Sequence, residues 1–399
     1  MLELTCETTR DRDLSTVSLR AHVRLVYRAP VRVRKSSSVN NLIWVQLLKS
    51  CIFAKKEDME LIVPQLYEFF DKVEDGKIGQ NLFDFIKTRE ECFFKDKYGE
   101  TNINVSQANY LSTICKKMVE DGLLINLNSS SNSPTTDKYF VQLRPTNFEY
   151  PELFEKQLAY GYYDFAYNGF PFIREHFLES VVPIVGINKN GDNDIGTAYY
   201  IGDNMFVTAG HCVLDLSRFT LQYQNGNQIR VSEVLFTDDK SIDLAIIKAD
   251  EEIQLTPFML GEPNILDDVL VMGYPPIPGM DAVLISETGS VNTFIPPVQK
   301  ASAGQVVAET KSYLPPMDYF LINCRVKGGN SGSPVINKHG LVVGTVVSLV
   351  YDSHGGSDGG RYDIMGFGTC LSSKFILNVQ KDGVAQEVEL NDGYYSILK

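Results

Sequence analysis

Three short motifs in the C-terminal half of the chain place a histidine, an aspartate and a serine in that order, and this order constrains the fold more than any other feature of the sequence. His211 lies in Thr-Ala-Gly-His-Cys, Asp243 in Ile-Asp-Leu-Ala, and Ser331 in Gly-Gly-Asn-Ser-Gly-Ser-Pro. A serine hydroxyl is a weak nucleophile until an imidazole accepts its proton, and the imidazole works best when a carboxylate fixes its tautomer. The sequence therefore predicts a triad of Ser331 as nucleophile, His211 as base and Asp243 as orienting acid.

The glycines around the serine fit the same chemistry. A substrate carbonyl must approach the backbone closely at such a turn, and glycine permits conformations that a Cβ obstructs. We expect the amides of Gly329 and Ser331 to donate hydrogen bonds to the developing oxyanion. The segment is thus predicted to supply both the nucleophile and the oxyanion hole.

The order of the triad also selects a fold. Histidine, aspartate and serine follow one another in this order in the chymotrypsin fold, whereas subtilisin-like enzymes and α/β-hydrolases use other orders. The first two residues are close in sequence and the serine lies far downstream. We expect the histidine and aspartate to come from one β-barrel and the serine from a second, with the active site at their junction.

Residues from about Val181 to Val379 resemble a trypsin-like domain of the bacterial high-temperature-requirement or glutamyl-endopeptidase branch. The resemblance implies an all-β double barrel and a serine endopeptidase that acts through an acyl-enzyme. Besides the three motifs above, it rests on five short runs in the family's order: Val181–Ile184, Ile195–Ala198, Val271–Pro275, Glu287–Val291 and Gly366–Gly368.

Three positions bear on the differences from members of this family. Digestive relatives pair an aspartate before the nucleophile with a new N-terminus, and Asn330 cannot form that ion pair, so activation by terminal insertion is not expected. Glutamyl endopeptidases carry a histidine where counting gives Val346, so glutamate specificity is not supported. Arg325, six residues before Ser331, stands where many trypsin relatives have the base of the specificity pocket. It either attracts an acidic side chain or points into solvent.

The cysteines and histidines predict neither disulfides nor metal sites. Seven cysteines are scattered without paired spacing, which favours free thiols in a reducing, cytoplasmic compartment. His22, His176, His339 and His354 do not lie at ligand spacings with cysteines or carboxylates. We therefore expect no metal and no cofactor.

Residues 1–39 differ from the rest and are interpreted as a basic, disordered leader. Residues 1–38 hold eight basic and four acidic side chains, whereas the whole chain has a net charge of −13. The segment has no apolar stretch of the length that a secretion signal needs, although import into an organelle stays open. The acidic body does not favour nucleic-acid binding.

Residues 40–149 have a helical pattern that ends in a predicted hairpin. Ser106 is the expected N-cap of a helix that Gly122 ends, and residues 81–94 are expected to form an earlier helix. Leu123–Ile125 and Tyr139–Leu143 then read as two strands. This plan resembles a winged-helix domain. Because the helix before the hairpin offers only Lys116 and Lys117, offset by Glu120 and Asp121, contact with a regulatory protein partner is favoured over DNA.

Residues 150–180 form an aromatic connector, and residues 181–399 the trypsin-like domain. The connector is too aromatic for a free linker, so we expect it to pack against the barrels. The glycine-rich loop Asp352–Gly360 is expected to gate activity by becoming ordered. Strands are predicted at Ala198–Ile201, Val231–Phe236, Leu244–Ile247, Asp281–Ile285, Phe320–Cys324 and Leu341–Val350, and a closing helix at Ser372–Val379.

The sequence thus indicates a soluble protein without a membrane span that hydrolyses protein or peptide substrates. Two other classes of function stay open: a DNA-binding regulator with a protease-derived sensor domain, and a protease-like scaffold without catalysis. The first needs basic groove contacts, and the second would carry an intact triad without using it.

Overall fold

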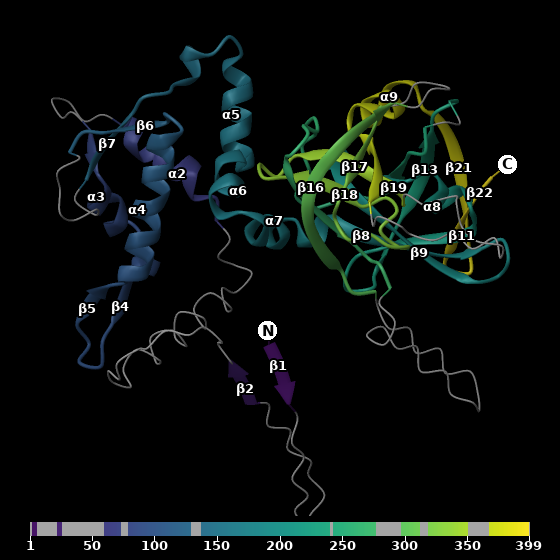
Figure 1. Cartoon of the computed structure of the whole chain (residues 1–399), viewed down its shortest axis with the longest axis horizontal. Coiled ribbons are helices and arrows are strands. Elements are labelled where there is room, and N and C mark those ends of the chain that lie inside the picture. The colour runs from purple at the N-terminus through teal and green to yellow at the C-terminus, as the bar shows by residue number, and fades with distance from the viewer. Residues whose placement is uncertain are drawn as a thin grey trace, which may run out of the picture. The chain divides into compact units, whose positions relative to one another are not determined.

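The computed structural model describes residues 2–5, 22–25, 60–72, 79–128, 137–239, 242–276, 297–311, 318–349 and 367–398 (Figure 1). The chain divides into two units, residues 1–58 and 59–399. In the first unit, β1 (Leu2–Thr5) pairs antiparallel with β2 (His22–Leu25). The rest of the predicted leader lies outside the described residues.

The second unit begins with a helical region that carries a small three-stranded sheet of order β3-β7-β6. A β4-β5 hairpin is inserted between its second and third helices. The elements in chain order are α2 (Ile62–Asp71), β3 (Gln80–Asn81), α3 (Leu82–Lys87), η1 (Glu90–Cys92), β4 (Phe93–Lys95), β5 (Thr101–Ile103), α4 (Val105–Glu120), β6 (Leu124–Asn126) and β7 (Lys138–Val141).

Two sequence-based expectations in this region are wrong in detail. The helix expected over residues 81–94 ends at Lys87, because the amide and hydroxyl of Thr88 both donate to the Phe85 carbonyl, at 3.0 and 2.7 Å. The N-cap of α4 is Asn104, whose side-chain oxygen accepts from the amides of Ser106 and Gln107 at 3.2 and 3.5 Å. Ser106 is therefore inside the helix.

Helices α5 (Pro151–Tyr160), α6 (Tyr162–Asn168) and α7 (Phe170–His176), with η4 (Leu178–Ser180), make up the aromatic connector. Phe154 is buried in the core of the helical region, whereas Phe165 and Phe177 are buried in the core of the barrels. The Asp164 carboxylate accepts from the amides of Ile62 and Val63, at 2.8 and 3.0 Å, and so satisfies the first turn of α2. The connector thus joins both cores through buried contacts.

The first barrel is a sheet of order β12-β11-β22-β21-β13-β14-β10-β9-β8 that closes by pairing β11 with β8 (Figure 1). Its C-terminal hairpin, β21 (Val384–Asn391) and β22 (Tyr394–Ile397), lies between β13 and β11. The other members are β8 (Val181–Asn188), β9 (Asn193–Gly202), β10 (Met205–Thr208), β11 (Leu216–Gln222), β12 (Gln228–Ile229), β13 (Val231–Phe236) and β14 (Ala245–Ala249).

The second barrel closes in the order β15-β16-β17-β20-β19-β18. Valines and other apolar residues fill it, including Val271, Val335 and Val346. The strands are β15 (Asp268–Gly273), β16 (Lys300–Lys311), β17 (Asp318–Ile322), β18 (Pro334–Asn337), β19 (Val342–Leu349) and β20 (Gly368–Ser372), followed by helix α9 (Lys374–Asp382). The predicted double β-barrel is therefore confirmed.

Five of the six strands predicted from the pattern overlap strands of the structure, and the predicted closing helix overlaps α9. The sixth, Asp281–Ile285, and the predicted gating loop Asp352–Gly360 lie outside the described residues.

Candidate active site

His211 and Asp243 are brought together by two neighbouring strands of the first barrel. His211 begins the short helix α8 (His211–Leu214) just after β10, and Asp243 lies just before β14, which pairs with β10. The imidazole Nδ1 lies 2.7 Å from one carboxylate oxygen of Asp243, and the His211 amide donates to the other at 2.8 Å. This double contact fixes the ring against the carboxylate.

A glycine makes this close approach possible. A Cβ on Gly210 would lie 3.0 Å from the Asp243 carboxylate and 3.4 Å from the Leu244 amide nitrogen. The glycine in the histidine motif thus leaves space for the aspartate.

Ser331 lies in a sharp turn that leads into β18. Gly329 and Gly332 on either side have φ values of +88° and +82°, a region that favours glycine. The Gly332 amide donates to the Val346 carbonyl at 2.7 Å, and the Ser333 amide donates to the Asn330 carbonyl at 2.9 Å. The second barrel therefore holds the turn from one side.

Thr197 of the first barrel holds the same turn from the other side. Its hydroxyl donates to the Gly329 carbonyl at 2.7 Å, and its amide donates to the Ser331 carbonyl at 2.9 Å. The same hydroxyl accepts from the Tyr274 amide at 3.2 Å. Thr197 lies within the run Ile195–Ala198, but its role could not be predicted, because a hydrogen bond between two barrels is not visible in the spacing of residues.

The serine turn and the histidine helix meet at the junction of the barrels. The thiol of Cys212, the residue after His211, donates to the Ser331 carbonyl at 3.4 Å. A Cβ on Gly332 would lie 2.0 Å from the Thr197 carbonyl oxygen and 2.3 Å from the Thr208 hydroxyl. The backbones that carry the predicted nucleophile and base are thus packed against each other without room for an additional carbon.

The two backbone amides that are predicted to form the oxyanion hole have no hydrogen-bond acceptor among the described residues. Within the described part of the chain, neither the amide of Gly329 nor that of Ser331 donates a hydrogen bond. Both amides are therefore available to a substrate oxygen.

Opposing effects act on the His211 imidazole. Burial lowers its pKa, but the hydrogen bond to Asp243 and the hydrogen bond and charge of Cys212 raise it, and the net result is a pKa of about 10. The aspartate therefore stabilises the protonated ring, which is the form that arises when an imidazole accepts a proton from a nucleophile.

Arg325 lines a pocket beside the serine turn, and Val346 does not. The pocket has a volume of about 220 Å³ and is formed by β15, β16 and the segment before Ser331. Val346 is 2% exposed and exchanges backbone hydrogen bonds with Gly332 and Ser333 inside the second barrel. Both residues were expected to bear on substrate specificity, and Arg325 is the one that lines this pocket.

Two kinds of feature are absent from the described ranges. No group of three or more histidine, cysteine or acidic side chains is placed there to hold a metal ion. Among the same residues, no helix is long and apolar enough to span a membrane.

Comparisons with known proteins agree with this architecture. Residues 196–344 match the family model of the trypsin-like peptidase domain. A "Serine protease HtrA-like" protein of Staphylococcus epidermidis is 31% identical over 202 residues, which are 46% of this chain and 32% of the relative. The human "Serine protease HTRA4" is 29% identical over 145 residues, 36% of this chain and 27% of the relative. The chain therefore spans less than a third of the length of either relative.

Solved structures of proteases are also similar. The active form of the Rv3671c protease from M. tuberculosis is 19% identical with a TM-score of 0.41, and the match covers 53% of this chain and 83% of that chain. The HtrA-type protease AlgW with a tripeptide is 18% identical with a TM-score of 0.39, covering 52% and 61%. Residues 196–344 therefore match a trypsin-like peptidase domain, and this part of the chain is similar to HtrA-type serine proteases.

Proposed function

We propose that this chain is a serine endopeptidase with Ser331, His211 and Asp243 as its catalytic triad. The observation that carries the proposal is the His211–Asp243 pair, bonded at 2.7 and 2.8 Å, at the place where the serine turn contacts Cys212 and Thr197. Protein or peptide substrates follow from the homology to proteases.

In the proposed reaction, the Ser331 hydroxyl oxygen attacks the carbonyl carbon of the scissile peptide bond and its proton passes to Nε2 of His211. The Asp243 carboxylate accepts from Nδ1 and stabilises the imidazolium. The amides of Gly329 and Ser331 donate to the oxygen that becomes negative. Transfer of the proton from His211 to the departing amine leaves an acyl-enzyme, which a water molecule hydrolyses by the same steps.

For residues 40–149 we propose a winged-helix-like domain that recognises a regulatory protein partner. The chain order α2, β3, α3, α4, β6, β7 supports the winged-helix plan, with β4-β5 as an insertion. Contact with DNA is less well supported, because one of the two lysines of α4, Lys117, already donates to the Tyr167 carbonyl at 2.6 Å. A gel shift on duplex DNA at low salt tests this, since salt-sensitive binding would favour DNA.

The catalytic proposal is tested with a fluorophosphonate probe and casein. We expect labelling and cleavage in the unmodified protein and in Ser232→Ala, an exposed serine of β13, and neither in Ser331→Ala. Loss of a nucleophile commonly lowers turnover by about a millionfold. Equal labelling of Ser331→Ala would overturn the assignment, and absence of labelling in the folded, unmodified protein would favour the non-catalytic scaffold.

A further inference from the structure

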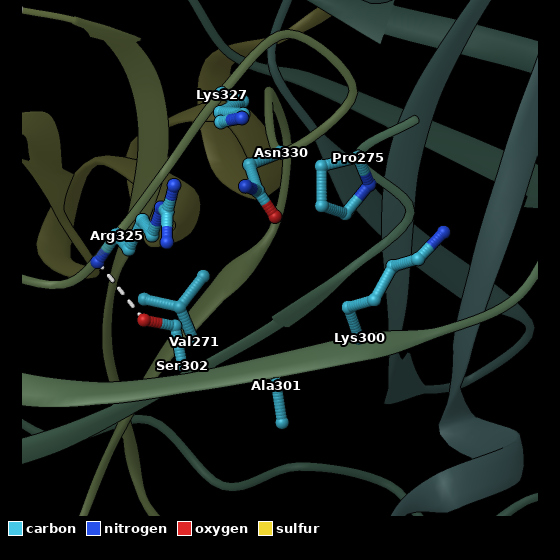
Figure 2. A pocket seen from close by; sticks show the side chains of 8 residues that line it. All are labelled: Val271, Pro275, Lys300, Ala301, Ser302, Arg325, Lys327 and Asn330. Carbon is cyan, nitrogen blue, oxygen red and sulfur yellow. Dashed lines mark hydrogen bonds between the residues drawn. The ribbon is translucent and has the colours of Figure 1, made fainter. Parts of the chain in front are cut away.

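The pocket beside the serine turn combines an apolar floor with cationic walls (Figure 2). Val271 and Pro275 are buried, whereas Arg325 and Lys327 are exposed. Figure 2 shows Asn330 between Arg325 and Pro275, with its side-chain nitrogen on the side of Arg325. Eight residues line the pocket: Val271, Pro275, Lys300, Ala301, Ser302, Arg325, Lys327 and Asn330.

The charges of this pocket are all of one sign. Three of the lining residues are cationic and none is acidic, in a chain whose net charge is −13. Among the described residues, neither the Arg325 guanidinium nor the Lys327 ammonium forms an ion pair. The Arg325 backbone is fixed, because its amide donates to the Ser302 hydroxyl at 2.9 Å. Two cationic side chains without an ion-pair partner among the described residues therefore line one small cavity.

Asn330 is a second, independent sign of a binding site. The residue is only 3% exposed, yet its side-chain amide makes no hydrogen bond within the described part of the chain. The side chain lines the pocket and is not fully enclosed by protein, so its amide can contact a ligand there. Its nitrogen can donate to an acceptor that enters the pocket.

We propose that this pocket binds a carboxylate group, which accepts from the Asn330 side chain and pairs with Arg325 and Lys327. Planar guanidinium groups bind carboxylates in a paired geometry, and the apolar floor suits the short carbon chain of an acidic side chain. A cavity of about 220 Å³ accommodates such a group but not a large ligand.

Binding at Asn330 acts directly on the nucleophile turn. The Asn330 amide donates to the Lys327 carbonyl at 3.0 Å, its carbonyl accepts from Ser333, and the next residue is Ser331. A carboxylate held by Arg325, Lys327 and Asn330 would join the two ends of this turn. The orientation of the Gly329 and Ser331 amides is thereby coupled to occupancy of the pocket, an effect that rests on the proposed function.

The carboxylate has two chemical sources: an acidic side chain of the substrate, or a separate acidic effector. A substrate group would lower KM for acidic peptides through the pocket. An effector would raise the rate of labelling of Ser331 when it is added separately, including with substrates that carry no acid.

The first experiment measures binding of N-acetyl-glutamate amide by isothermal titration calorimetry at constant ionic strength, with N-acetyl-glutamine amide as the neutral match. We expect saturable binding of the acidic compound alone, weakened at least tenfold in Arg325→Gln and in Lys327→Gln. Arg218→Gln and Lys189→Gln, which remove the same charges away from the pocket, should bind normally. Asn330→Asp, which keeps the shape and adds a negative charge, should not bind.

Kinetics then assign the source and separate this inference from the catalytic one. Peptides with Glu and Gln before the scissile bond are compared in the unmodified protein and in Arg325→Gln, and the rate of fluorophosphonate labelling is measured with and without the acidic compound. A preference for Glu that the variant loses supports a substrate side chain, and faster labelling supports an effector. Equal binding of both compounds, or normal binding by the pocket variants, would overturn the inference even if Ser331 is labelled. Binding of the acidic compound without any labelling would support the pocket and overturn the endopeptidase.

Discussion

The two sides of the candidate active site differ in how far the chain itself satisfies them. On the first-barrel side, the Asp243 carboxylate accepts from both the ring and the amide of His211. On the second-barrel side, the Gly329 and Ser331 amides and the Asn330 side chain have no hydrogen-bond partner among the described residues. The side proposed to transfer the proton is thus complete within the fold, whereas the side proposed to bind the substrate carbonyl has hydrogen-bond donors without a partner among the described residues. The predictions below test this difference.

Removing the Asp243 charge on the first-barrel side should have the largest effect on activity. Asp243→Asn keeps the size of the side chain but removes the charge and the acceptor that fix the ring, so we expect kcat/KM to fall by about 10⁴. Peptide hydrolysis measures this, with Asp250→Asn, an exposed aspartate at the end of β14, as the matched control. A fall of less than tenfold would mean that Asp243 does not orient the base.

Adding a Cβ at Gly332, next to Ser331, should strongly destabilise the folded protein. Gly332→Ala forces a positive φ on alanine and places a carbon 2.0 Å from the Thr197 carbonyl oxygen, so the free energy of unfolding should fall by about 3 kcal/mol or more. Gly328→Ala is the control, because no atom lies within 4 Å of its added carbon. Chemical denaturation compares the two, and similar midpoints would contradict the tight packing of the barrels.

Removing one bond across the barrel junction should cost less. Thr197→Val leaves the Gly329 carbonyl and the Tyr274 amide without the hydroxyl that both contact, for a loss of about 1–3 kcal/mol. Thr220→Val removes an equally buried hydroxyl that has no partner in the described structure, so its stability should be unchanged or higher. The same denaturation experiment distinguishes them, and equal losses would show that the Thr197 bonds contribute nothing.

The pH dependence should show the most gradual effect, about tenfold in kcat/KM for each pH unit below the pKa of the base. Since the pKa of His211 is raised to about 10, kcat/KM should increase with pH until the imidazole loses its proton, well above the ordinary value of 6.5. Asp243→Asn should shift this limb to lower pH, because the hydrogen bond that raises the pKa is weakened.

The same shift links His211 to stability. A group whose pKa is raised by folding stabilises the folded state fully below its unfolded pKa, and this contribution is lost as the pH rises toward about 10. Urea midpoints between pH 6 and pH 10 should therefore decrease more in the unmodified protein than in Asp243→Asn. An equal decrease would show that the aspartate does not stabilise the protonated ring.

The sequence predicts the double barrel well because alternating strands and the order of three motifs are local or nearly local signals. The sequence predicts that a helix begins near residues 104–106. It does not show whether Asn104 or Ser106 is the N-cap, because both residue types cap helices. Other features depend on residues that are far apart in the sequence, so the spacing of motifs does not predict them. Examples are the hydrogen bonds of Thr197 to the serine turn and the surroundings of the Asn330 side chain. For the same reason, the sequence did not show whether Arg325 binds an acidic side chain or points into solvent.

The hairpin β21-β22 makes closure of the first barrel depend on the order of synthesis. Residues 384–397 fill the gap between β11 and β13, so the ring that carries His211 and Asp243 closes only when these residues are available. During translation, the serine turn is made before this closure, but the histidine and aspartate do not yet lie on a closed sheet. We expect a ribosome-bound chain to react with a fluorophosphonate only after β22 has emerged, which would protect both the nascent chain and its neighbours from premature cleavage.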